Sequence, residues 1–173
     1  MQKIMGKEIE LTDLVDASGV IKKQGVPRNE IDLYPDLHLQ IAIAVIFNKS
    51  GEILVQKRAM TKSSEKGKID HVCGSVISGE TPEEAAIRES KEETGIDPNN
   101  VRIVDKGLNK YNRYRYLLVG KTDCLPGKFD PNEVEWVKFI SLEKLRKDET
   151  SGEFKFVGEF FEDTEIAIRN FRK

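Results

Sequence analysis

Three glutamates lie close together in the sequence, at a spacing that would let their side chains act as one group. Glu89, Glu92 and Glu93 fall in a segment with a helical pattern, and at about 100° per residue they occupy one sector about 100° wide. Like charges at this spacing repel each other in an isolated helix. Carboxylate oxygens are the ligands that a hard divalent cation such as Mg²⁺ requires, together with water and substrate phosphates. A solvated acidic face is the usual interpretation of this spacing alone, and a magnesium site is the alternative that the wider motif must decide.

A helix from Pro82 to Thr94 must present these carboxylates, and the sequence marks both of its ends. Thr81 is the expected N-cap, and Pro82 occupies the first helical position, where the missing N–H costs nothing. Glu84, three residues after the cap, completes a capping box. Gly95 provides the stop signal. We expect the opposite side of this helix, which carries small residues, to pack against a sheet.

The segments around this helix predict an α/β (α+β) fold, with a mixed β-sheet sandwiched between helices and an N-terminal β-hairpin. The near-continuous apolar run at 39–47 is typical of a central strand buried on both faces. The hairpin would join 9–15 to 20–26, with Gly19 in the turn. Further strands are expected at 52–58, at 69–77 with an interruption at Gly74, and at 101–106, 111–120 and 134–140, and helices at 141–147 and 158–172.

Composition excludes several classes of protein. The chain has 173 residues and a formal charge of −2, which provides no long-range field for a nucleic acid polymer or an anionic membrane. The longest apolar run, at 41–47, is far shorter than the roughly 20 residues that a membrane span needs. Two cysteines, Cys73 and Cys124, do not make a disulfide framework, and the first eight residues lack the apolar stretch of a secretion signal. We therefore expect a cytoplasmic protein.

The full spacing around the glutamates resembles the box of the Nudix hydrolase superfamily. Gly74, Glu80, the pair Arg88-Glu89, the pair Glu92-Glu93 and the pair Gly95-Ile96 stand at the intervals of that motif. We call residues 74–96 the acidic box. One position departs from the pattern, since Ser90 stands where a large aliphatic residue is usual. The resemblance implies a Nudix fold and a single Nudix domain over 1–173, with 1–36 as a hairpin extension and 37–173 as the core.

The resemblance also implies a chemistry, namely hydrolysis of a nucleoside diphosphate linked to another moiety with Mg²⁺ or Mn²⁺. Glu89, Glu92 and Glu93 would be the metal ligands, joined by the backbone at Gly74. Arg88 would hold a box glutamate by a charge-assisted hydrogen bond, and Glu80 would either support the metal ligands or occasionally bind the metal itself. The base that takes a proton from water would be a box glutamate or Glu133, whose alternative is a charge on a surface loop.

A second resemblance, over roughly residues 10–96, is to isopentenyl-diphosphate isomerase, an enzyme with the Nudix fold. It implies that Cys73 handles a proton at carbon and that His38 binds a metal. The alternatives are a small buried thiol and a hydrogen-bonded residue at the start of a strand. The other two isomerase histidines correspond to Ile31 and Ser75, which cannot replace imidazole ligands. We therefore expect hydrolase chemistry on an isomerase-like scaffold, with an isomerase or a non-catalytic nucleotide-binding module as rivals.

Substrate recognition requires cations and aromatic rings near the acidic box. Arg58 and Lys62 flank the loop that leads into the box and are expected to bind the diphosphate, with exposed charge as the alternative for Arg58. Tyr114 and Tyr116 are candidates to stack on a nucleobase, although period-two alternation in a strand explains them equally well. His71 is expected to be structural. The expected partner is a small-molecule diphosphate, and the sequence leaves open whether the chain is a monomer or a homodimer.

Overall fold

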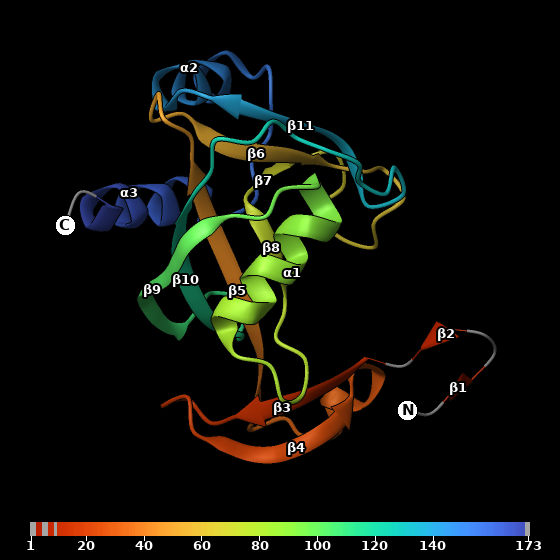
Figure 1. Cartoon of the computed structure of the whole chain (residues 1–173). Helices are drawn as coiled ribbons and strands as arrows, with labels where there is room; N and C mark the ends of the chain where they lie inside the picture. The colour runs from red at the N-terminus through yellow and green to blue at the C-terminus, as the bar shows by residue number, and fades with distance from the viewer. Residues whose placement is uncertain (1–2, 5–6, 9, 172–173) are drawn as a thin grey trace.

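The computed structural model describes residues 3–4, 7–8 and 10–171 (Figure 1). Two two-residue strands, β1 (Lys3–Ile4) and β2 (Lys7–Glu8), pair with each other near the N-terminus. The other strands are β3 (Leu11–Val15), β4 (Ile21–Pro27), β5 (His38–Phe47), β6 (Ile53–Arg58), β7 (Ile69–Asp70), β8 (Val72–Ser75), β9 (Asn99–Leu108), β10 (Tyr114–Lys121) and β11 (Val134–Ile140). The helices are α1 (Pro82–Thr94), α2 (Leu142–Ser151) and α3 (Phe160–Phe171), with a short 3₁₀ helix over Arg28–Leu33.

The main sheet is mixed and runs in the order β11-β6-β5-β10-β9. β5 and β10 pair in parallel, and the other neighbours pair antiparallel. β6 meets β5 only at its start, where Ile53 pairs with Phe47. Further along, β8 takes over the edge of β5, while β7 pairs with β6. β5 and β6 therefore diverge. His71, between β7 and β8, lies where the chain changes its pairing partner from β6 to β5.

The two faces of β5 build two separate cores. Alternate residues such as Ile43 and Val45 pack with Phe160 and Ala167 of α3. The residues between them, Ala42, Ala44 and Ile46, pack with Ala85 and Ala86 of α1. α1 and α3 therefore cover opposite faces of the sheet, as Figure 1 shows. Because every residue of β5 is buried, the prediction of a central strand with both faces covered is confirmed.

Most predicted elements are present, and several of them begin, end or break at other residues than expected. The N-terminal hairpin is formed by β3 and β4, and Gly19 in its turn has a φ of 85°. The strand predicted at 69–77 is broken at His71 and not at Gly74, because its two halves pair with different partners. The strand predicted at 111–120 begins at Tyr114, since residues 109–113 form a turn, and the helix after β11 continues to Ser151. No helix in the described parts of the chain is long and apolar enough to cross a bilayer.

Candidate functional site

The helix that carries the three glutamates begins and ends as its sequence predicts. The Thr81 hydroxyl accepts a hydrogen bond from the backbone N–H of Glu84 at 3.2 Å, and the Glu84 carboxylate accepts one from the Thr81 N–H at 2.8 Å. The helix ends at Gly95, whose φ of 69° is left-handed. These caps fix the register of α1, and so they fix which residues face the sheet.

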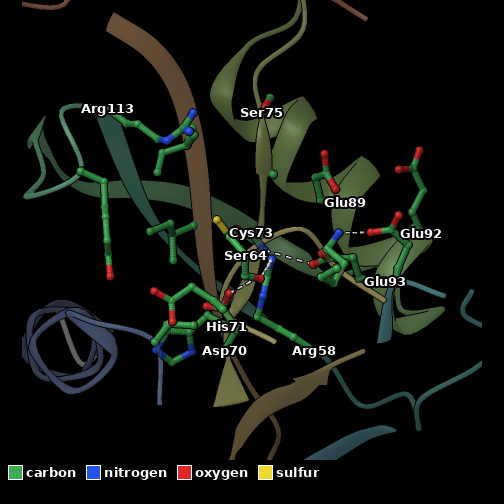
Figure 2. A pocket seen from close by; sticks show the side chains of 18 of the residues that line it. Arg58, Ser64, Asp70, His71, Cys73, Ser75, Glu89, Glu92, Glu93 and Arg113 are labelled. Atoms are coloured by element: carbon green, nitrogen blue, oxygen red, sulfur yellow. Dashed lines mark hydrogen bonds and ion pairs between the residues drawn. The ribbon is translucent and has the colours of Figure 1, made fainter. Parts of the chain in front are cut away.

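The three glutamates share one side of α1 but differ in burial (Figure 2). Glu93 is only 7% exposed, and its Oε2 accepts hydrogen bonds from Gln56 Nε2 at 2.7 Å and from the Cys73 N–H at 3.1 Å. Glu89 is largely buried against β8, with 13% of its side chain exposed, and Glu92 is exposed. A row of carboxylates thus runs from the interior of the protein to its surface.

The contact between Glu89 and β8 requires a glycine. A Cβ built on Gly74 would lie 1.9 Å from the Cδ of Glu89, so no other residue fits unless this carboxylate moves. Gly74 pairs with Ala42 in the centre of the sheet. The glycine therefore allows the carboxylate to lie directly against the backbone of a strand.

Arg88 holds the surrounding carboxylates in place. Its Nε and Nη2 donate to the two oxygens of Glu80 at 2.8 and 3.0 Å, a bidentate pair. Its Nη1 donates to Glu89 at 2.7 Å, and Nη2 also donates to the carbonyl of Ser75 at 2.9 Å. The hydrogen bonds to Glu80 and Glu89 raise the pKa of Arg88 above its usual value. As predicted, Arg88 contacts a box glutamate.

Burial has a strong effect on two of the carboxylates. It raises the pKa of Glu89 to about 7, although the hydrogen bond and charge of Arg88 oppose this shift. Burial, together with the charge of Glu89, raises the pKa of Glu93 well above its usual value. At Glu89 burial therefore outweighs the positive charge of Arg88, and Glu93 has no cationic partner among the described residues.

A divalent cation fits this donor set by its chemistry. Glu89, Glu92 and Glu93 supply the oxygen ligands that Mg²⁺ or Mn²⁺ prefers, and the buried carboxylates need a counter-charge. Within the described residues, no three acidic, histidine or cysteine side chains already converge on one point. Arg88 instead bonds to Glu89 and lies 3.5 Å from Glu92. Binding a cation would require these two carboxylates to turn toward it.

The acidic box forms one end of a large cavity of about 1470 Å³. Arg58, Lys62 and Glu133 line the wall beside the box. Ile41 and Ile43 of β5 form an apolar floor with Cys73 of β8, with which Ile43 pairs. The turn between β9 and β10 and the segment before α3 close the far end with Asn109, Tyr111, Arg113 and Glu159.

The predicted phosphate-binding residues lie together in this wall. Arg58 is largely buried, with 14% of its side chain exposed, so it is not the exposed edge charge that was the alternative. Its Nη1 donates to Asp70 at 3.2 Å, and its Nη2 donates to the Ser64 carbonyl at 3.3 Å. Burial raises the pKa of Asp70 to about 6, against the charge of Arg58. Lys62 and Glu133, which line the same wall of the cavity, form an ion pair.

Of the two residues singled out by the isomerase resemblance, only Cys73 lines the cavity. Burial raises the pKa of the Cys73 thiol well above the usual value. His38 is buried outside the residues that line the cavity, with its Nδ1 3.2 Å from the carbonyl of Asn112. The structure places His38 as a hydrogen-bonded residue at the start of β5.

The two tyrosines expected to stack on a base do not face the cavity, which corrects that prediction. Tyr114 is 4% exposed and packs on Gly19, and its hydroxyl donates to the Ser18 carbonyl at 3.3 Å. The Tyr116 hydroxyl donates to Gln40 at 2.9 Å. Strand alternation turns both rings toward the other face of the sheet.

The cavity is also lined by Asn109, Tyr111 and Arg113, which were not predicted as site residues. Residues 111–113 were expected in a strand, but β10 begins at Tyr114. Two asparagines, Asn109 and Asn112, could have indicated a turn at this point of the sequence. Asn109 Oδ1 accepts hydrogen bonds from the N–H groups of Tyr111 and Arg113, and Asn112 has a φ of 58°. Asparagine favours both arrangements and is typical of turns.

Comparison with known proteins identifies relatives over most of the chain. Residues 37–160 match the model of the NUDIX domain family. An uncharacterized Nudix hydrolase of Listeria innocua is 31% identical over 165 residues, which are 89% of this chain and 95% of the relative. The 8-oxo-dGTP diphosphatase of Escherichia coli is 38% identical over 60% of this chain and 83% of its own length. An isopentenyl-diphosphate Delta-isomerase of Streptomyces coelicolor is 31% identical over 80% of this chain and 74% of its own.

The fold also matches solved structures. The protein DR0079 from Deinococcus radiodurans superposes with a TM-score of 0.71 and covers 91% of this chain and 99% of its own, at 23% identity. At that identity the likeness establishes the fold alone.

Proposed function

The chain is a Nudix hydrolase, and from that premise we propose that it uses Mg²⁺ or Mn²⁺ to cleave a phosphoanhydride bond in a nucleoside diphosphate-type substrate. The observation that supports this most directly is the row of Glu89, Glu92 and Glu93 along one wall of the cavity. The name of the diphosphatase relative from Escherichia coli is consistent with a nucleotide as substrate.

The residues around the acidic box have separate tasks in this proposal. Arg88, bonded to Glu80 and to the Ser75 carbonyl, sets the orientation of Glu89. Gln56 and the Cys73 N–H set the orientation of Glu93. Glu89, Glu92 and Glu93 would hold the metal, with backbone at Gly74 beside them. When bound, the metal would neutralise the diphosphate and lower the pKa of a water molecule.

Other residues would bind the diphosphate and move the proton. The planar guanidinium of Arg58 suits contacts to two phosphate oxygens, and Lys62 supplies a second cation in the same wall. A carboxylate must accept the proton of the attacking water, and two sources are available. One is a box glutamate, and the other is Glu133, which Lys62 holds at the cavity mouth.

An isomerase remains the second candidate because Cys73 lines the cavity and isomerases are among the relatives. By the isomerase resemblance, Ile31 and Ser75 correspond to two of its histidines, and His38 does not line the cavity. We therefore favour the hydrolase. The two differ in product, since an isomerase converts isopentenyl diphosphate without phosphate release and would be inactivated by Cys73→Ala.

The test is a screen for hydrolysis with Mg²⁺ and with Mn²⁺, and with EDTA as the blank. The substrates are nucleoside di- and triphosphates, nucleotide sugars, dinucleotides and isopentenyl diphosphate. We expect metal-dependent cleavage of at least one nucleotide, and a loss of about 100-fold or more in kcat for Glu92→Gln and for Glu93→Gln. Circular dichroism should show that both variants fold.

The matched control is Glu143→Gln, because Glu143 is exposed on α2 and does not line the cavity. It should keep the activity of the parent protein. Wild-type activity in either box variant would contradict the metal assignment. A protein that binds nucleotides but cleaves none of them would instead be a binding module.

A further inference from the structure

The far end of the cavity is built by two segments that are distant in sequence. A Cβ placed on Gly158, just before α3, would lie 2.6 Å from the hydroxyl of Tyr111, so the turn between β9 and β10 packs directly on this segment. The N–H of Lys110 also donates to the Glu159 carboxylate at 3.2 Å. Asn109 fixes the turn from inside, through its two hydrogen bonds to backbone N–H groups. The wall is therefore a defined surface with a fixed backbone.

Arg113 is the unusual residue in this wall. The cavity is lined by three other arginines, and Arg28, Arg58 and Arg88 each pair with a carboxylate. In the part of the chain that the structure describes, Arg113 forms no ion pair. It is half-buried, and in Figure 2 its side chain reaches from the start of β10 toward β5. A half-buried guanidinium without a carboxylate is suited to an anion from outside the chain.

The carboxylates near Arg113 contact other groups, so its guanidinium remains free to bind an anion. Arg115, two residues further along β10, is paired with Asp105 and with Asp163. Glu159 accepts the hydrogen bond from the Lys110 backbone. The carboxylates at this end of the cavity are thus engaged by other groups.

Sheet register gives the separation between Arg113 and the acidic box. Arg115 and Ser75 both pair with Ile41, on opposite edges of β5. Gly74 and Arg113 are therefore separated by three residue steps along β5 and two spacings between strands, or about 14 Å between Cα atoms. Of the apolar floor, Ile41 lies between these two levels of β5, and Ile43 with Cys73 lies one step beyond Gly74. The side chain of Arg113, which reaches toward β5 (Figure 2), covers part of this separation, and a ligand that contacts both ends must span the rest.

We propose that Arg113 determines specificity by binding a second anionic group, a phosphomonoester or a carboxylate, at the end of the substrate that lies away from the scissile bond. This inference rests on the proposed function and names the substrate class more narrowly. The substrate has two charged ends, with its phosphoanhydride at the acidic box and its middle over the apolar floor. Tyr111, which is 46% exposed, offers a ring beside the distal group.

The test compares pairs of substrates that differ by one anionic group. The pairs are UDP-glucuronate and UDP-glucose, CoA and dephospho-CoA, and NADPH and NADH. We expect the wild-type protein to prefer the charged member of at least one pair by about 10- to 100-fold in kcat/KM, since a charge-assisted bidentate contact contributes that much. Arg113→Gln should remove this preference by raising KM for the charged member, and it should lower kcat/KM for the neutral member much less. Arg113→Lys should restore part of it.

The matched control is Arg169→Gln, because Arg169 is exposed on α3 and does not line the cavity. It should keep the preference of the parent protein. Hydrolysis with no preference in any pair, or a preference that survives Arg113→Gln, would overturn this inference and leave the hydrolase proposal intact. Absence of hydrolysis for every diphosphate would overturn the hydrolase proposal itself.

Discussion

His71 shows how strongly burial can constrain a single residue. The ring is 1% exposed and stacks on Phe160 with centroids 4.1 Å apart. Its Nε2 lies 3.2 Å from the Phe160 carbonyl, which only accepts, so the proton is assigned to this nitrogen. The other nitrogen, Nδ1, has no partner among the described residues. Burial lowers the pKa of His71 from 6.5 to about 4, so the folded protein keeps the ring neutral.

This depressed pKa predicts a loss of stability in acid. Below pH 6.5 the unfolded chain binds a proton at His71, and the folded protein does not bind one until the pH approaches 4. The free energy of unfolding should therefore fall by about 2 kcal/mol between pH 7.5 and pH 5 on account of this residue. His71→Phe keeps an aromatic ring against Phe160 and should lack this part of the decline. Urea unfolding of both proteins at the two pH values, with EDTA present, measures the difference.

Carboxylates elsewhere titrate in both proteins, so they cancel from the comparison. An equal decline in the parent and in His71→Phe would show that His71 does not carry the effect.

At the scale of residues, the placement of Glu89, Glu92 and Glu93 on one side of a helix was predictable, because their types and spacing lie within α1. Whether Tyr114 and Tyr116 face the cavity was not predictable, since this depends on which face of the sheet the cavity lies on. Arg113 was not predicted because it was expected in a strand, and because its lack of an ion pair among the described residues depends on where distant carboxylates lie.

At the scale of elements, two helices end in the same way in different surroundings. α1 ends at Gly95 with a φ of 69°, and α2 ends at Gly152 with a φ of 73°. A Cβ on Gly95 would lie 2.6 Å from the Cα of Gly127, whereas a Cβ on Gly152 would meet nothing within 4 Å. Gly127 also donates a hydrogen bond to the Thr94 carbonyl at 2.9 Å. The segment that leads to Glu133 is therefore packed directly on the end of α1.

This pair predicts two different costs for the same substitution. Gly152→Ala should lower the free energy of unfolding by about 1 kcal/mol, because only the left-handed conformation is penalised. Gly95→Ala should cost about 2–4 kcal/mol, because the methyl group must also displace the backbone at Gly127. Urea denaturation of the two variants gives both values. Equal costs would mean that the approach of Gly127 to α1 does not constrain the fold.

The elements that could be predicted from the sequence are those whose ends are decided by residues close together in the chain. Both ends of α1 were correct to the residue, because capping is decided within four residues of the chain. The break at His71 was missed, because it arises from a choice between two partner strands, β6 and β5. Such a choice depends on the whole sheet and leaves no mark in the sequence of the broken strand.

At the scale of the whole molecule, Arg115 links the sheet to α3. It pairs with Asp105 on the neighbouring strand β9 and with Asp163 on α3, and 12% of its side chain is exposed. Asp163 itself is almost fully buried. Nothing in the local sequence relates these three residues, which come together only when α3 covers its face of the sheet. The burial of Asp163 raises its pKa to about 7, in opposition to the charge of Arg115.

Removing Arg115 should therefore be costly, and the cost should depend on pH. Arg115→Met leaves the Asp163 charge buried without a partner and should lower the free energy of unfolding by about 3–5 kcal/mol at pH 8. The pKa of Asp163 is raised above its unfolded value of 3.8, so the folded protein binds a proton that the unfolded chain releases. Acidification from pH 8 to pH 6 should thus recover part of the loss.

A double-mutant cycle with Asp163→Asn separates the ion pair from packing. In the parent protein, Asp163→Asn removes the partner of Arg115 on α3 and should destabilise the fold. In the Arg115→Met protein, the same change removes an uncompensated buried charge and should stabilise it at pH 8. This reversal of sign follows only if the pair, and not the volume of the side chains, connects α3 to the sheet. Urea unfolding of the four proteins measures it, and a destabilising effect of Asp163→Asn in both backgrounds would contradict the assignment.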